Sequence, residues 1–148
     1  MALTMPAMTT VADLMTTDVV SLAEEQDVLF ATGAMQLRRI RHLPVVRGDT
    51  LVGLVSHRDL LRAQARFNAQ IHEDEGSTIA SVVARDVMTE EVTTVSPGMP
   101  ADEAAMLLVD GKFGCLPVVN DGTLVGIVTE HDFLRWAVGM LASANAGA

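Results

Sequence analysis

The chain has 148 residues, the usual length of one compact domain or of two very small ones. Hydrophobic residues make up 49% of it and charged residues 20%, which excludes a disordered chain, and the single cysteine excludes an intrachain disulfide framework and a cysteine-rich zinc site. A formal net charge of −9 argues against non-specific nucleic-acid binding, which needs a basic surface.

The first third of the chain predicts a helix, a strand and a second helix. Thr10 can cap a short helix over Val11 to Met15, and Val19 to Leu22 is a short β-rich run. The next helix begins at Asp27. Its apolar face is expected to hold Val28, Ala31, Met35 and either Leu37 or Ile40.

Two strands and a third helix follow. Leu43-Pro44-Val45-Val46 predicts a buried strand, and Pro44 suits its start. Gly48-Asp49 is a turn, and Leu51 to Val55 is the second strand. A charged helix is expected to start near Ser56, which has the chemistry of an N-cap, with Asp59 three residues later as in a capping box.

After a polar connector at 66–80, the same order of elements returns. The expected elements are a strand at Val92 to Val95, a helix at Pro100 to Val109 with Ala104, Leu107 and Leu108 inward, a turn at Asn120-Asp121-Gly122 and a last helix from Thr129 to Leu141. Residues 8–65 and 81–141 therefore form two α-β-α-β-β-α units, an α/β fold of the α+β type.

An internal repeat explains this order. Residues 13–62 align with residues 86–135 at a constant offset of 73 positions, without a gap and with 17 identities in 50. A unit of about 50 residues buries its own apolar faces poorly. We therefore expect the two units to pack on each other about a pseudo-two-fold axis.

No export signal or membrane span is expected. The first 12 residues contain no Lys or Arg, so a positively charged leader is missing. The uncharged run from Trp136 to Ala148 falls short of the roughly 20 apolar residues that a spanning helix needs. We expect a cytoplasmic protein that contacts neither membrane nor nucleic acid.

The repeated motifs resemble a known family. Asp-x-Met-Thr, Val-x-x-Leu/Val, Leu-Pro-Val-Val, a Gly-Asp or Asp-Gly turn, and Leu-Val-Gly-x-Val-Ser/Thr-x-x-Asp occur twice in tandem. Over residues 11–140 the chain resembles a tandem cystathionine β-synthase (CBS) domain pair, and a stand-alone one. The resemblance implies a flat module with two clefts that bind AMP, ATP or S-adenosylmethionine, and a homodimer.

The Ser/Thr-x-x-Asp element has a physical rationale. It stands where a strand passes into a helix, and the free N–H groups there form an anion site. Ser56 and Thr129 can bind phosphate or ribose oxygens, while Asp59 and Asp132 can accept hydrogen bonds from ribose hydroxyls. The alternative is an ordinary helix cap at each site.

By the resemblance, each cleft draws on both units. Cleft A is expected to hold Asp18, Val19, Val20, Ile40, Arg41, His42, Thr129, His131 and Asp132. Cleft B is expected to hold Ser56, His57, Arg58, Asp59, Val92, Thr93, Phe113, Gly114 and Cys115. Ile40 and Phe113 suit the face of an adenine base. The alternative is that both fill the core, and for Ile40 this alternative is nearly as strong.

Charge separates the two repeats. Residues 13–62 hold six Arg and seven acids, a net charge of −1, whereas residues 86–135 hold two basic residues and nine acids, a net charge of −7. The best phosphate partners are Arg41, His42 and Arg58, while Arg38, Arg39 and Arg47 suit a solvated face. Glu130 disfavours a highly charged ligand, so AMP or ADP is favoured over ATP without Mg²⁺.

These residues favour a regulatory module over an enzyme. A P-loop, a recognisable Ser-His-Asp pattern and a metal cage are missing, and no cofactor is expected. The rival reading is a ligand-free dimeric scaffold that binds a protein effector of unknown identity. Cys115 suits a small buried hydrophobe better than a redox sensor. The apolar face of the last helix can serve dimerisation or packing within the monomer.

Overall fold

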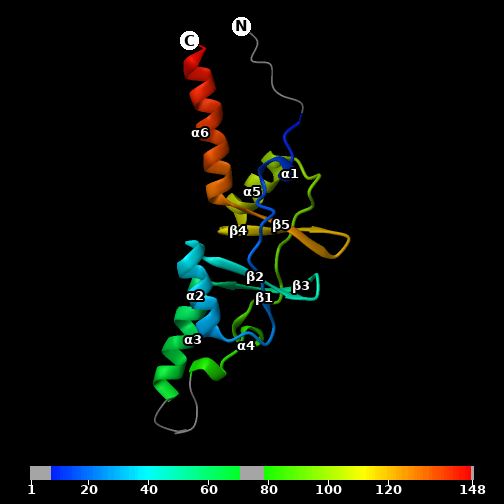
Figure 1. Cartoon of the computed structure of the whole chain (residues 1–148). Coiled ribbons are helices and arrows are strands. Elements are labelled where there is room, and N and C mark those ends of the chain that lie inside the picture. Colours follow the sequence, from blue (N-terminus) through cyan, green and yellow to red (C-terminus); the bar gives the residue numbers. More distant parts are fainter. Residues whose placement is uncertain (1–7, 71–78, 148) are drawn as a thin grey trace. The chain divides into compact units, whose positions relative to one another are not determined.

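A computed structural model describes residues 8–70 and 79–147 (Figure 1). The chain divides into two compact units. We call Val20–Val92 the middle unit, and we call Met1–Val19 together with Thr93–Ala148 the terminal unit. Each unit is therefore built from parts of both sequence repeats.

The middle unit contains most of the first repeat. Its elements are β1 (Leu22–Ala23), α2 (Val28–Arg38), β2 (His42–Arg47), β3 (Thr50–Ser56), α3 (His57–Gln70), the 3₁₀ turn η1 (Ile79–Ser81) and α4 (Ala84–Val87). Strand β2 pairs with β1 in parallel and with β3 as an antiparallel hairpin. Leu22, Leu43, Val45 and Val55 are fully buried at the centre of its core.

The terminal unit repeats the hairpin with three helices around it. Its elements are α1 (Val11–Leu14), α5 (Ala101–Gly111), β4 (Cys115–Asn120), β5 (Thr123–Thr129) and α6 (Glu130–Ala146). The β4–β5 hairpin has the register of β2–β3, including the irregularity between Val118 and Val119 that matches the one between Val45 and Val46. The buried core includes Val11, Ala104, Leu116, Val118 and Val128.

The compact units exchange the short helix that begins each repeat. Helix α1 comes from the first repeat but lies in the terminal unit, and α4 comes from the second repeat but lies in the middle unit. The residues after each helix continue the exchange, because Thr16 pairs with Ile127 and Thr89 pairs with Leu54. The repeats at 8–65 and 81–141 are therefore units of sequence. Each hydrophobic core is formed by most of one repeat together with the first helix of the other. Of the connector at 66–80, residues 71–78 lie outside the described part.

The predicted helix starts and faces are largely confirmed. Asp27 caps α2 by accepting a hydrogen bond from the backbone N–H of Phe30 at 2.8 Å, and Val28, Ala31 and Met35 are buried. Leu37 is 84% exposed, so the alternative with Ile40 against the core is the correct one. In α5, Ala104 and Leu108 are buried and Leu107 packs beside them.

The predicted strand at Val92 to Val95 is wrong. Only Val95 pairs with the sheet, through a single parallel bridge to Val118. Val95 donates to the carbonyl of Pro117 and accepts from the N–H of Val119. The next donor along the strand falls on Pro97, which has no N–H. Pairing therefore does not continue beyond Val95, while Val92 to Thr94, which precede the bridge, form no strand.

An ion-pair network fastens α4 to the middle unit. The guanidinium of Arg47 donates to both carboxylate oxygens of Glu24, at 2.7 and 3.1 Å. Arg85, on α4, donates to Glu24 at 3.3 Å and to Glu25 at 2.6 Å. Arg47 was predicted on a solvated face, and its side chain is indeed 73% exposed, but the carboxylate it binds is only 8% exposed.

This network predicts acid-sensitive stability. The hydrogen bond from Arg47 is the main cause that holds the pKa of Glu24 below its ordinary value of 4.5, and it outweighs desolvation, which acts in the opposite direction. The contribution of Glu24 is therefore present above its unfolded-state pKa and is lost as the pH falls through the lowered folded-state pKa. Glu24→Gln should lower the urea midpoint at pH 7, and this difference from wild type should shrink below pH 4.5. The exposed variant Glu90→Gln is the control. Equal midpoints for Glu24→Gln and wild type at pH 7 would contradict the prediction.

Candidate ligand-binding residues

Each predicted cleft takes residues from both compact units, so its assembly stays a prediction. The structure does show which of these residues share a unit. Ile40, Arg41, His42 and the segment from Ser56 to Asp59 belong to the middle unit. Phe113, Gly114, Cys115 and the segment from Thr129 to Asp132 belong to the terminal unit. Each unit therefore carries one half of cleft A and one half of cleft B.

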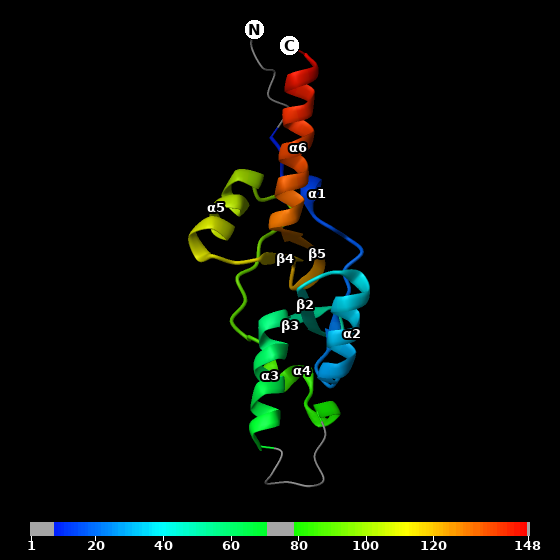
Figure 2. The same cartoon turned by 90° about the vertical axis from the view of Figure 1, so that its left-hand side faces the viewer.

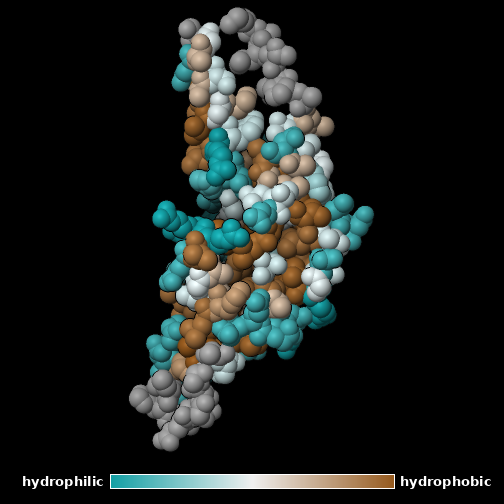
Figure 3. All heavy atoms as spheres, viewed as in Figure 1, coloured by the Kyte–Doolittle hydropathy of each residue, from teal (hydrophilic) through white to brown (hydrophobic). Residues whose placement is uncertain are grey.

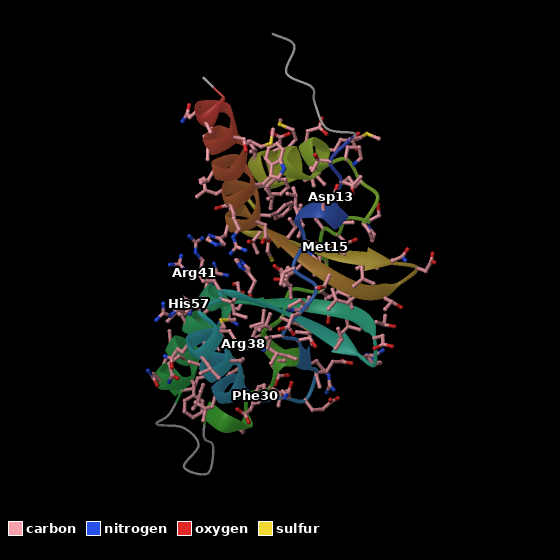
Figure 4. All side chains as sticks on the ribbon, turned by 45° about the horizontal axis from the view of Figure 1, so that its top comes forward. Asp13, Met15, Phe30, Arg38, Arg41 and His57 are labelled. Carbon is pink, nitrogen blue, oxygen red and sulfur yellow. The ribbon has the colours of Figure 1, made fainter. Side chains whose placement is uncertain are left out.

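In the middle unit these two halves meet at one end of the hairpin. His42 lies opposite Ser56 in the β2–β3 register, and the N–H of His57 donates to the carbonyl of Arg41 at 2.8 Å. Figure 4 shows Arg41 and His57 at this end. The antiparallel pairing thus brings the end of the α2–β2 loop beside the start of α3, and it gathers basic side chains there.

A reciprocal capping box stands at the start of α3. The backbone N–H and the hydroxyl of Ser56 both donate to Oδ2 of Asp59, at 2.8 and 2.9 Å, and the N–H of Asp59 donates back to Oγ at 3.2 Å. This geometry is the helix cap that the sequence offered as an alternative. Among the described residues, no hydrogen bond is assigned to Oδ1 of Asp59, so that oxygen can accept from a ligand hydroxyl.

The terminal unit has the same box with one addition. The N–H and hydroxyl of Thr129 donate to Oδ2 of Asp132 at 2.8 and 3.1 Å. The hydroxyl of Thr16 lies 3.4 Å from Oδ1 of Asp132, so both oxygens of this carboxylate have a partner. Sequence reasoning missed Thr16. Its signal was available, because it is the threonine of the Asp-x-Met-Thr motif and the exchanged segment carries it to β5.

The remaining predicted residues have distinct surroundings. Asp18 and Thr93 are exposed, and Val19, Val20 and Val92 are half-buried in segments without regular structure, where the chain passes between units. Ile40 packs against the middle core, which favours its core role. The equivalent Phe113 is 36% exposed, which leaves part of its ring available to a ligand.

The same positions carry different charges in the two units. At an offset of 73, Arg38, Arg39, Arg41, His57 and Arg58 of the middle unit correspond to Gly111, Lys112, Gly114, Glu130 and His131 of the terminal unit. The middle unit is therefore equipped for an anion and the terminal unit is not. Within the described residues, no group of three or more His, Cys, Asp or Glu side chains is placed to hold a metal ion.

The thiol of Cys115 is protected. The residue is 4% exposed at the start of β4, and burial raises the pKa of the thiol to about 12. The reactive thiolate is thus scarce near neutral pH, which weighs against redox sensing. We expect the folded protein to react with a disulfide reagent at pH 8 at least about tenfold more slowly than the urea-unfolded chain, whose thiol has an ordinary pKa near 8.5. Comparable rates, measured by thiol titration, would contradict the assigned burial.

The comparisons with known proteins agree with the repeat. The family model described as the CBS domain matches residues 11–66 and 84–139. The CBS domain-containing protein YhcV of Bacillus subtilis is 30% identical over 141 residues, which cover 95% of this chain and 91% of that protein. A Methanocaldococcus jannaschii relative, MJ1225, is also 30% identical, but this chain spans only 47% of its length.

Solved structures show the same fold. The AcuB protein of Vibrio cholerae superposes with a TM-score of 0.82 and 33% identity, over 95% of this chain and 98% of that one. CBSX2 in complex with AMP gives 0.75 and 32%, over 88% and 97%. The CBS domain pair of protein MJ0100, in complex with 5′-methylthioadenosine and S-adenosyl-L-methionine, gives 0.76 and 25%, over 90% and 99%.

Proposed function

Because the chain belongs to the CBS-domain family, we propose that it is a regulatory module that binds an adenosine-containing ligand, AMP, ADP or ATP, and that it is not an enzyme. The ligands named for two of its structural neighbours, AMP in one and 5′-methylthioadenosine with S-adenosyl-L-methionine in the other, share the adenosine group. The proposal also places the protein in the cytoplasm as a homodimer, with a protein effector that receives its signal. In the described part of the chain, no helix is long and apolar enough to cross a membrane.

One observation carries the proposal, namely the basic hairpin end beside the Ser56–Asp59 cap. Arg41, His57 and Arg58 lie around the first turn of α3, where their basic side chains and the positive end of the helix dipole favour an anion. Oδ1 of Asp59 can accept a hydrogen bond from a ribose hydroxyl. The basic side chains would then bind the phosphate of a nucleotide, and Asp59 would bind its ribose. Sites of this kind combine an apolar lining with a few polar anchors.

The charges of the two units decide how many phosphate groups we expect the ligand to carry. The middle unit supplies cations, whereas the terminal unit places Glu130 at the position of His57. A ligand in cleft A, which also contacts Thr129 and Asp132, meets this acid unless Arg41 compensates it. We therefore favour AMP or ADP over free ATP, and Mg²⁺ bound to ATP would change that ranking. No resident cofactor or metal is needed for this function.

Isothermal titration calorimetry tests the proposal. The purified protein is titrated with AMP, ADP, ATP and S-adenosylmethionine, each with and without Mg²⁺. We expect saturable binding with a micromolar dissociation constant for at least one of them, and the stoichiometry reports whether one cleft or both are used. Absence of binding by all four, in both conditions, would refute the adenosine-ligand function.

A second candidate function is a ligand-free dimeric scaffold that binds a protein. The capping boxes favour it, because Oδ2 of Asp59 and Oδ2 of Asp132 are already used to cap their own helices. It predicts a folded dimer whose thermal stability does not change with any of the four compounds. A ligand-induced rise in stability would decide against the scaffold.

A further inference from the structure

Helix α3 carries a row of arginines that the predicted clefts do not explain. Arg58, Arg62 and Arg66 recur at i, i+4 and i+8, so they lie on one face of the helix, each about 6 Å along its axis from the next. All three are exposed. Only Arg58 belongs to a predicted cleft, so Arg62 and Arg66 have no part in the nucleotide site. We call these three residues the arginine row.

The arginine row is an exception among the helices. Each of the other helices in the described part of the chain contains at most one Lys or Arg. Of the ten Lys and Arg residues in the sequence, three form the row and three lie at 38–41, where α2 ends. Helices α2 and α3 are in contact within the middle unit (Figure 2). In Figure 3 hydrophilic side chains project at this end of α2 and along the outer edge of α3. A local basic surface therefore stands on a chain whose net charge is −9.

The charges of the arginine row have no partner in the described part of the chain, where no hydrogen bond or ion pair is assigned to its side chains. Arg47 and Arg85 differ, because both bind Glu24. The single acid of α3, Asp59, caps the helix. Like charges at i and i+4 destabilise a helix. The row therefore lowers the stability of α3, and an anion from outside this part of the chain would offset that effect.

The second repeat shows that the fold does not require the arginine row. At an offset of 73, the three positions hold His131, Arg135 and Gly139 in α6. Nη2 of Arg135 lies 3.0 Å from Nε2 of His131, so the one arginine that is kept there has a partner within its own helix. The row is therefore a feature of α3 and not of the architecture that both repeats share.

We propose that the arginine row binds an acidic helical segment of the protein effector, with Glu or Asp side chains at i, i+4 and i+8. This inference rests on the effector of the proposed function and names the chemistry that would recognise it. Carboxylates at that spacing repeat along a helix at the same interval as the arginines, and each guanidinium can bind one of them with two parallel N–H donors. Leu61, which is 57% exposed, and Ala65 lie beside the row and can contact an apolar side chain of the same segment.

Charge and composition favour an acidic protein over a nucleic acid. Nucleic acids bind to extended basic surfaces, and single strands also stack their bases on aromatic side chains. The aromatic residue of α3, Phe67, is half-buried. A long polyanion would also meet the acids that give the chain its net charge of −9, whereas a short acidic segment can contact the row alone.

Fluorescence polarisation with the full chain tests this proposal. The probe is a labelled alanine-rich helical peptide with Glu at every fourth position. We expect saturable binding that weakens with added salt, because salt screens exposed charges. Arg62→Glu should weaken this binding at least about fivefold, since it replaces an attraction with a repulsion. The matched control Arg135→Glu makes the same change of charge at the same register of α6 and should keep the affinity of wild type.

Several outcomes would overturn the proposal. One is absence of binding by wild type, and another is an equal loss in both variants, which would be a general effect of net charge. Tighter binding of poly(U) than of the peptide would assign the row to RNA instead. Equal binding of a peptide of the same composition, with its glutamates in one block, would overturn the spacing. Both substituted positions are exposed, so circular dichroism should show both variants folded.

Calorimetry with AMP, ADP and ATP separates this proposal from the nucleotide function. Arg62 belongs to neither predicted cleft, so Arg62→Glu should bind nucleotide as wild type does while it loses the peptide. If wild type binds the peptide but none of the nucleotides, the nucleotide function fails and the arginine row stands. If it binds a nucleotide but not the peptide, the row is refuted and the nucleotide function stands.

Discussion

Gly126→Ala is expected to destabilise the protein by about 1–3 kcal/mol, the usual cost of overpacking a tight contact. A Cβ at Gly126 would lie 2.8 Å from the sulfur of Met15 and 3.0 Å from the carbonyl oxygen of Thr16. The thioether can move, but Thr16 is held by its backbone pairing with Ile127. The added methyl group therefore displaces Met15 and Thr16, which follow α1, from their place beside β5.

Gly53→Ala should act in the same direction in the middle unit. A Cβ there would collide with the side chain of Met88 and approach the carbonyl oxygen of Thr89 at 3.1 Å. Thr89 pairs with Leu54 just as Thr16 pairs with Ile127. Both glycines thus mark the place where one repeat's first segment crosses onto the other repeat's hairpin.

Two helical glycines provide the controls for urea unfolding. Nothing lies within 4 Å of a Cβ at Gly33 in α2 or at Gly139 in α6. Alanine at either position should stabilise the protein by about 0.5–1 kcal/mol, since it lowers the entropy lost on folding. If Gly126→Ala also stabilised the protein, the close contact of Met15 and Thr16 with Gly126 would be refuted.

The sequence predicted the elements well because the repeat shows each of them twice. The hairpins, the helix starts at Thr10 and Asp27, the caps at Ser56 and Thr129, and the buried faces of α2 and α5 follow from local patterns of polarity and turn residues. The strand at Val92 to Val95 was wrong because a β-rich run does not show whether a partner strand lies beside it, and only the last of its four residues forms a bridge.

The exchange of segments could not be predicted in this way. A repeat in the sequence says which residues are alike, but it does not say with which hairpin the first helix of each repeat packs. Only spatial contacts, such as Thr16 with Ile127 and Arg85 with Glu24, reveal the interleaving. The same limit applies to Thr16 beside Asp132, since 116 residues separate them.

Asp59→Asn is expected to weaken nucleotide binding about tenfold or more while it lowers the stability of the free protein only modestly. The amide oxygen can still accept from the N–H of Ser56, so the cap keeps one of its bonds and the loss stays near the lower end of about 0.5–2 kcal/mol. A ribose hydroxyl, by contrast, loses an ionised acceptor, and charged hydrogen bonds contribute about 1.5–3 kcal/mol.

Ligand-induced stabilisation separates these two effects. A bound ligand at one hundred times its dissociation constant stabilises wild type by about 2.7 kcal/mol, and each tenfold loss of affinity removes about 1.4 kcal/mol of this increment. Urea unfolding with and without AMP therefore measures the cap and the ligand contact in the same variant. We expect the increment to fall by at least about half in Asp59→Asn.

Asp13→Asn is the matched control, because Asp13 accepts from the N–H of Thr10 at 2.8 Å in the same kind of capping box and belongs to neither predicted cleft. It should lose a similar cap contribution and keep the full increment with AMP. If both variants keep the increment, Asp59 is a helix cap and the nucleotide binds elsewhere. If both lose it equally, the effect is general destabilisation. Only a loss confined to Asp59→Asn makes this carboxylate a ligand contact, because the two variants share their cap chemistry and differ in their predicted access to the ribose.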